Sequence, residues 1–327
     1  MNKFAGSVAG FVFSGDLFAR SLCASSDTGE IFYGHVPDAA NVAGTGARTK
    51  AQIEYQMPSL IAHEFTHDIQ FSRRLVILGS STVMSGWAAE GQAMLAQEVV
   101  GHSVLGNTTG QNYSSATALQ GQGDRWYGQA FDQLSYYFGH LRSGSKATGA
   151  PELCSLFAAG ISTPCENDHF YGASWSFQRY LADRFGPAYP GGEIQLNRDV
   201  IGKFPALQGE PNWEALLGAS FDTLQARWAA MLYADDRVPG LASAIQLPSW
   251  NLFGVFSSYP NDTYRLIPVD RQFAAFSDSR GVIGGSTAYT TITSAGARPA
   301  LAVRVRDNSN GILGTAMKPV LWILRIQ

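Results

Sequence analysis

The sequence predicts an α+β fold, with a small sheet and then helices in residues 1–239 and a small all-β module in residues 240–327. Three observations predict it. Apolar and polar residues alternate in parts of the first 56 residues, helical periodicity begins at residue 57, and short β-type runs replace it after Pro239. A chain of 327 residues is also long enough for about two domains.

The composition excludes several classes of protein. Charged residues make up 15% of the chain, the net charge is −3, and Arg73-Arg74 is the longest basic cluster. These values argue against nucleic acid and anionic membranes, which bind basic patches. No apolar run approaches the about 20 residues of a spanning helix. We therefore expect a soluble protein with neither nucleic acid nor a membrane as partner.

The elements of the first part follow from periodicity. Two strands are expected at Ser7–Phe13 and Glu30–Val36, the second ending at a Pro-Asp turn. A helix is expected from Pro58, since proline is tolerated in a first turn and Ile61, Phe65 and Ile69 follow at four-residue steps. The remaining helices are expected at Trp87–Val100, Arg125–Leu141, Ala173–Phe185 and, as one or two helices, Trp213–Met231.

The second part reads as strands at the spacing of turns. The expected strands are Leu247–Phe256, Tyr264–Val269, Ala288–Thr293, Leu301–Val305 and Val320–Ile326. Asp307 begins a segment that resembles a calcium loop, but its twelfth position is Lys318 instead of an acid, so a hairpin turn is favoured.

The most informative stretch is His63-Glu64-Phe65-Thr66-His67. Histidines four residues apart on a helix project from the same face, so both imidazoles can reach one metal ion. Glu64 lies beside them and can take the proton of a metal-bound water, as a general base does in metal-assisted hydrolysis. Chance predicts about 0.003 such motifs in this chain, so a metal site is favoured over two ordinary helix histidines.

A catalytic zinc usually takes three protein ligands and leaves one position to water. The elongated three-histidine motif is excluded, because Gln70 and Arg73 occupy the positions of its glycine and its third histidine. Glu90 lies 23 positions after His67 on the next expected helix, where an antiparallel pair would return its carboxylate to the metal. Two alternatives stay open: Glu98 or His102 as the ligand, or a structural Glu90 with another ligand.

His-Glu-Phe-Thr-His followed by Trp-Ala-Ala-Glu-Gly resembles the gluzincin metallopeptidases. Within that group, the two short motifs are most similar to those of the hyicolysin-type bacterial peptidases. The resemblance covers about residues 32–185. It implies a zincin-like catalytic domain, zinc held by His63, His67 and Glu90, and Glu64 as the base. It also implies that the strand Glu30–Val36 is the sheet edge on which a peptide substrate lies extended.

The resemblance implies an oxyanion donor on a later helix. In aminopeptidase-like members a tyrosine three residues before a glycine has this role; here His169 stands three residues before Gly172, and Tyr171 is two residues off. Either can donate a hydrogen bond, so both are candidate catalytic residues. The aspartate that orients a ligand histidine in thermolysin-like enzymes is replaced by Met94, which leaves Asp68 as a candidate for that support.

These features together predict a zinc-dependent endopeptidase with peptides or proteins as substrates. The aminopeptidase run Gly-x-Met-Glu-Asn is missing from the chain, which disfavours exopeptidase action. The alternatives are a catalytically inactive zinc-binding protein and a protein that binds ligands through its β module. A lysine-poor composition rich in Ser, Thr, Asn and Gln favours a secreted or cell-envelope protein, in which Cys154 and Cys165 are close enough in sequence to form a disulfide.

Overall fold

The computed structural model describes three long stretches, residues 9–44, 46–114 and 167–257. It also describes residues 155, 157, 266, 268–273, 282, 284–294, 296, 304–306, 309, 311–314, 319–321 and 323. The expected helix Arg125–Leu141 and the pair Cys154 and Cys165 lie outside the described residues. Helices and small sheets combine in one chain, as expected for an α+β fold.

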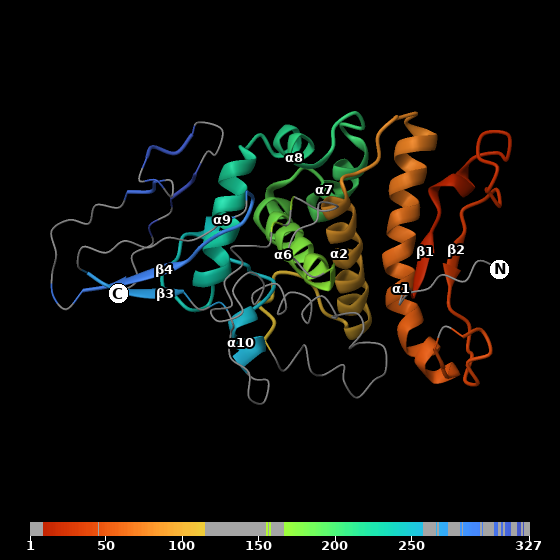
Figure 1. The fold of residues 1–327 in the computed structure, drawn as a ribbon, viewed down its shortest axis with the longest axis horizontal. Coiled ribbons are helices and arrows are strands. Elements are labelled where there is room, and N and C mark those ends of the chain that lie inside the picture. The colour runs from red at the N-terminus through yellow and green to blue at the C-terminus, as the bar shows by residue number, and fades with distance from the viewer. Residues whose placement is uncertain are drawn as a thin grey trace.

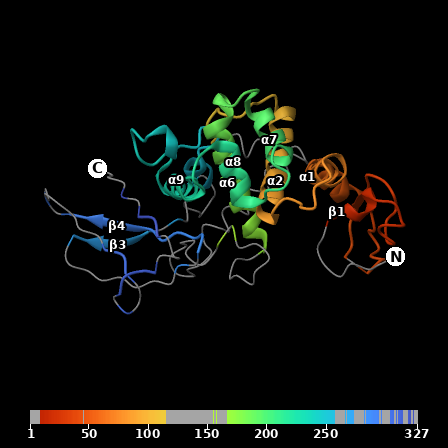
Figure 2. The ribbon, with the colours of Figure 1, turned by 90° about the horizontal axis from the view of Figure 1, so that it is seen from above.

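A two-stranded antiparallel sheet opens the fold. Strand β1 is Gly10–Val12 and strand β2 is Phe32–Gly34, so both are shorter than expected. A 3-10 helix, Ser14–Leu17, follows β1. The sheet lies beside helix α1, and both views place β1 next to that helix (Figures 1 and 2).

Helix α1 spans Lys50–Phe71 and starts eight residues before the expected Pro58. Its start is fixed by a capping box: the Thr49 hydroxyl accepts from the Gln52 backbone N–H, and the Gln52 side chain accepts from the Thr49 N–H. Pro58 therefore lies inside the helix, which corrects the expected boundary. A π-helical turn, Ser72–Ile77, continues from α1.

The helical part continues with α2, which spans Gly86–Leu105 and ends at the left-handed Gly106. The expected Ala173–Phe185 is part of α6, Asn167–Phe185, and the expected Trp213–Met231 is two helices, α8 and α9. The other helices are α7, Gly192–Gly202; α8, Gly209–Leu217; α9, Phe221–Ala234; and the 3-10 turns Gly186–Ala188 and Ser243–Ile245.

The core lies between α2, α6 and α9, and α1 covers the other side of α2 (Figures 1 and 2). Large aromatic rings fill it: Phe177 meets Trp87 and Phe221 edge to face, and Trp87 and Phe221 are tilted, at centroid distances of 5.5 to 5.8 Å. Helices α1 and α2 therefore lie side by side, with α2 held against the core.

The expected strand Leu247–Phe256 is wrong. Residues Leu252–Ser257 form the short helix α10, and Trp250 before it is fully buried in the helical core. A short apolar run fits a buried strand and a buried helix equally well, so packing decided its conformation. The predicted domain boundary near residue 240 stays a prediction, and residues 247–255 pack with the helices before it.

Two short strands follow α10. Strand β3, Val269–Gln272, pairs in parallel with β4, Thr290–Thr293, at the end of the molecule opposite β1 and β2 (Figure 1). Strand β4 lies within the expected strand Ala288–Thr293, whereas β3 shares only Val269 with the expected strand Tyr264–Val269 and runs beyond it. Among the described residues after 257, these two strands are the regular elements. None of the described helices is both long and apolar enough to cross a membrane.

Candidate metal centre

The two motif histidines lie on the buried face of α1. His63 and His67 are each 9% exposed, and their rings meet at a centroid distance of 4.9 Å. The face of α1 that carries Ile61, Phe65 and Ile69 is the exposed one, at 42 to 57%. Helix α1 therefore turns its polar residues toward α2 and leaves an apolar stripe outside, the reverse of an ordinary amphipathic helix.

Glu90 on α2 completes the cluster, as the sequence predicts. Its Oε2 lies 3.1 Å from Nε2 of His63 and 3.2 Å from Nε2 of His67, and the two Nε2 atoms are 3.2 Å apart. Among the described residues, His63, His67 and Glu90 form a group that could hold a metal ion, since their ligand atoms all lie within 4.8 Å of one another. The three ligand atoms face one point from two helices.

A glycine fixes how α2 presents this carboxylate. A Cβ atom on Gly91 would lie 2.7 Å from the Ser174 carbonyl oxygen of α6, so only glycine permits this close approach of the two helices. The neighbouring residue Glu90 is about 100° away around α2, where it faces His63 and His67 of α1. The Glu-Gly pair of the motif thus has a packing reason as well as a chemical one.

Two glutamine side chains orient the histidine rings. The Nδ1 atom of His63 is 2.9 Å from Oε1 of Gln97, and the Nδ1 atom of His67 is 3.0 Å from Oε1 of Gln70. An amide oxygen only accepts, so each Nδ1 carries the proton and donates it. Nε2 is then the nitrogen that faces Glu90: when protonated it donates to the carboxylate, and when neutral its lone pair is available to a metal.

The Gln70 amide is itself held in one orientation. Its Nε2 donates to the Ala89 carbonyl at 3.2 Å and to Oε1 of Gln92 at 3.0 Å, and Nε2 of Gln92 donates to the Asn197 carbonyl at 2.8 Å. Because backbone carbonyls cannot donate, both amides have their oxygens pointing back toward the cluster. The chain of hydrogen bonds links His67 through α2 to α7.

The charges of the cluster stabilise one another. Burial alone would raise the pKa of Glu90, but hydrogen bonds from His63 and His67 and their positive charges lower it to about 2. Burial alone would lower the pKa of His67, and the Glu90 carboxylate outweighs it and raises that pKa. Protons and a metal ion therefore compete for the same lone pair, which makes metal affinity dependent on pH.

Glu64 lies next to this cluster on the side of the sheet. It is 7% exposed and accepts a hydrogen bond from the backbone N–H of Val12 in β1. Burial raises the pKa of Glu64, and the neighbouring His63 and His67 lower it less. A carboxylate whose pKa is raised toward neutrality suits a group that takes up and releases a proton.

Both candidate oxyanion donors lie on α6. The Tyr171 ring is tilted beside that of His63, at a centroid distance of 6.1 Å. His169 is in the first turn of α6, and its side chain lies outside the described residues. The structure thus brings Tyr171 to the edge of the cluster.

The alternative ligands Glu98 and His102 face away from this cluster. Glu98 is fully buried, and its carboxylate oxygens accept from the indole N–H groups of Trp175 at 2.6 Å and Trp250 at 2.9 Å. His102 lies beside it, with Nε2 3.4 Å from Glu98 Oε1. These groups belong to a second polar cluster inside the helical core.

Support for the ligands comes from amides instead of the acid that the sequence suggested. Asp68 lies on the sheet side of α1, where it lines a pocket with Glu30. Sequence reasoning missed Gln97, although it lies seven residues after Glu90 and therefore on the same face of α2 two turns later. It used Gln70 only to exclude a longer motif, although three residues after His67 is a helical contact position.

No protein-family model matches the chain, and neither does any of the curated proteins compared with it.

Proposed function

We propose that the protein is a zinc-dependent endopeptidase with a zincin-like catalytic domain. One observation carries the proposal: two imidazole nitrogens and a carboxylate oxygen lie within 4.8 Å of one another, beside the buried carboxylate of Glu64. Two histidines and one glutamate are a ligand set that catalytic zinc sites use. Oriented Nε2 lone pairs support this fit.

Zinc held in this way supplies a Lewis acid that polarises a carbonyl and lowers the pKa of water toward 7. The chain supplies the proton transfers. Glu64 takes the proton of the attacking water and later gives it to the leaving amine, which needs a pKa above that of an ordinary glutamate. The Val12 N–H keeps this carboxylate in place beside the ligands.

The outer edge of β1 supports a peptide as the substrate. His35 N–H donates to the Ala9 carbonyl, so Ala9 and Phe11 face β2, and the backbone groups of Gly10 and Val12 point to the other edge. The Val12 N–H on that edge is directed at Glu64, which leaves the Val12 carbonyl and the Gly10 groups for a peptide. An extended peptide can pair with such an edge. The resemblance placed this edge at residues 30–36, whereas β1 is the strand next to Glu64.

Tyr171 is the oxyanion donor that we favour, because its ring lies beside His63, and His169 is the alternative. A phenol that donates to the developing negative charge stabilises the transition state more than the ground state.

The test measures zinc and cleavage together. Zinc content after gel filtration and cleavage of an unfolded protein substrate are compared for the wild type, Glu64→Gln and Glu54→Gln, an exposed control on the same helix. We expect one zinc per chain in all three, and a loss of cleavage of about 100-fold or more in Glu64→Gln alone. Zinc without cleavage by the wild type would favour an inactive zinc-binding protein, and a chain that binds no zinc would contradict both readings.

A further inference from the structure

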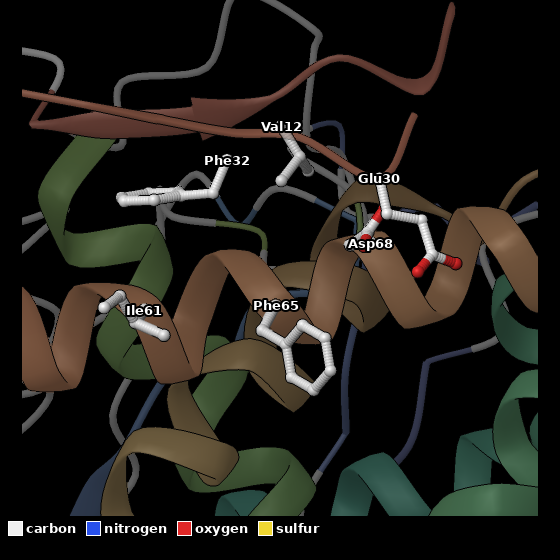
Figure 3. Close-up of a pocket in the computed structure, with 6 residues that line it drawn as sticks. All are labelled: Val12, Glu30, Phe32, Ile61, Phe65 and Asp68. Atoms are coloured by element: carbon white, nitrogen blue, oxygen red, sulfur yellow. The ribbon is translucent and has the colours of Figure 1, made fainter. Parts of the chain in front are cut away.

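A second feature lies on the other side of Glu64, between the N-terminal sheet and α1. It is a cavity of about 180 Å³ lined by Val12, Glu30, Phe32, Ile61, Phe65 and Asp68. Its lining combines apolar side chains with two carboxylates, and Glu30 and Asp68 lie side by side at one end (Figure 3). The cavity is therefore apolar along its walls and acidic at one end.

The deeper of the two acids has no partner. Asp68 is 8% exposed, and among the described residues none donates a hydrogen bond to its carboxylate or forms an ion pair with it. Glu30 is exposed and accepts one hydrogen bond, from the Ser72 hydroxyl at 3.1 Å. The Asp68 carboxylate lines the cavity together with Glu30, so the acidic end favours a cationic ligand.

The cavity adjoins the proposed catalytic base. Asp68 lies four residues after Glu64, which places it one helical turn further along the same face of α1. Val12 connects the two sites, since its backbone N–H bonds to Glu64 while its side chain lines the cavity. The cavity and the proposed catalytic base therefore share Val12 as a neighbour.

The size of the cavity suits one long side chain. A volume of 180 Å³ equals the liquid volume of about six water molecules. Lysine has a chain of four methylene groups that can lie against Phe32, Ile61 and Phe65 while its ammonium group meets the carboxylates. Arginine can do the same with its guanidinium group.

We propose that this cavity binds the lysine or arginine side chain of a substrate peptide next to the cleaved bond. The inference rests on the proposed peptidase function and names its substrate class. Apolar walls alone would accept methionine or leucine equally well, so the acids are what selects a cation.

The test uses two hexapeptides that differ only in a central lysine or methionine, with the wild type, Asp68→Asn and the control Glu54→Gln. We expect kcat/KM of the wild type and the control to favour the lysine peptide by about 10-fold or more, as one desolvated charge pair would give. In Asp68→Asn the preference should fall to about 3-fold or less, because kcat/KM falls more for the lysine peptide than for the methionine peptide, and the zinc content should stay at one per chain.

A second measurement separates this inference from the proposed function. The affinities of fluorescent versions of both peptides are measured for Glu64→Gln, with and without Asp68→Asn. They report on side-chain binding in the cavity in the absence of cleavage. A preference for lysine that depends on Asp68 supports the cavity even if the wild type cleaves nothing. Equal binding of both peptides, or a preference that survives Asp68→Asn, overturns the inference whether or not the protein is a peptidase.

Discussion

Helix α2 carries two glutamates that each meet a histidine, eight residues apart, in very different surroundings. Glu90 meets His63 and His67 and retains 25% exposure of its side chain, whereas Glu98 meets His102 with none. Glu98 is also 3.9 Å from Arg179, whose guanidinium pairs with Asp183 at 2.7 Å. Both clusters are polar and lie on the same helix, so the helix alone does not distinguish their roles.

The difference lies in what occupies the carboxylate oxygens. Two indole N–H groups and a permanent cation satisfy Glu98, and they leave no lone pair aimed at a common point. Among the described residues, Glu90 Oε2 meets the Nε2 atoms of His63 and His67, whose rings are oriented by Gln97 and Gln70. A buried polar cluster can bind a metal ion when its acceptor atoms converge on one point. It stabilises the fold instead when protein donors already bond to those acceptors.

The largest expected effect comes from Glu90→Gln. Mutation of a residue that supports a metal ligand typically lowers metal affinity or activity by about 10–100-fold. Removing the anionic ligand itself should reduce zinc affinity and cleavage by more than that. Zinc titration against a chelator and kcat/KM measure both. A variant that keeps full zinc affinity would show that Glu90 is not a ligand.

The matched change, Glu98→Gln, should act on folding instead. Each Glu98 oxygen accepts from a different indole, and in glutamine one of them becomes an NH2 group that cannot accept. Part of the buried Arg179 charge is also left unbalanced, so unfolding should become easier by about 3 kcal/mol. Urea unfolding of the metal-free protein measures this. Loss of zinc from the folded variant would contradict the separation of the two clusters.

A smaller effect is expected from Gln97→Met. The side chain keeps its volume but no longer accepts from the His63 ring, so the tautomer that points Nε2 at the metal loses its support. Zinc affinity should fall by about 10–100-fold. Gln195→Met on α7 serves as the control, and an equal fall in both variants would remove the assigned role of Gln97.

The smallest effect is a pH dependence of the metal-free protein. The folded pKa of His67 is raised by Glu90, so its contribution to stability is complete below the ordinary histidine value of 6.5 and is lost as pH rises through the raised value. Unfolding free energy should therefore fall as pH rises above 6.5. Zinc should reverse the trend, because its binding strengthens as the imidazoles lose protons. Parallel curves with and without zinc would contradict this.

The ligands of the centre could be predicted from the sequence because the spacing of the two histidines and the glutamate along the chain indicates a metal site. His63 and His67 need only one helix, and Glu90 needs only that the next helix returns beside it. The orienting amides could not be ranked in this way, since glutamines are common and their role depends on the distance between α1 and α2. Gln92 reaches α7, a helix that was not expected from the sequence.

Boundaries depended on other signals. The start of α1 was readable from Thr49 and Gln52, a capping box at the correct spacing, but Pro58 was given more weight. Residues 247–256 could not be assigned from periodicity, because the burial of Trp250 against Glu98 and Trp175 is a long-range contact. The polar inner face of α1 is a further case where the function of the site overrides the ordinary pattern.

The most direct test of the metal centre is zinc K-edge X-ray absorption of the protein loaded with one equivalent of zinc. We predict two imidazole nitrogens at about 2.0–2.1 Å and a carboxylate oxygen in the same shell, with four or five ligands in total. In Glu90→Gln the carboxylate contribution should disappear. A spectrum of the wild type with sulfur ligands, or with fewer than two imidazoles, would contradict the assignment of His63, His67 and Glu90.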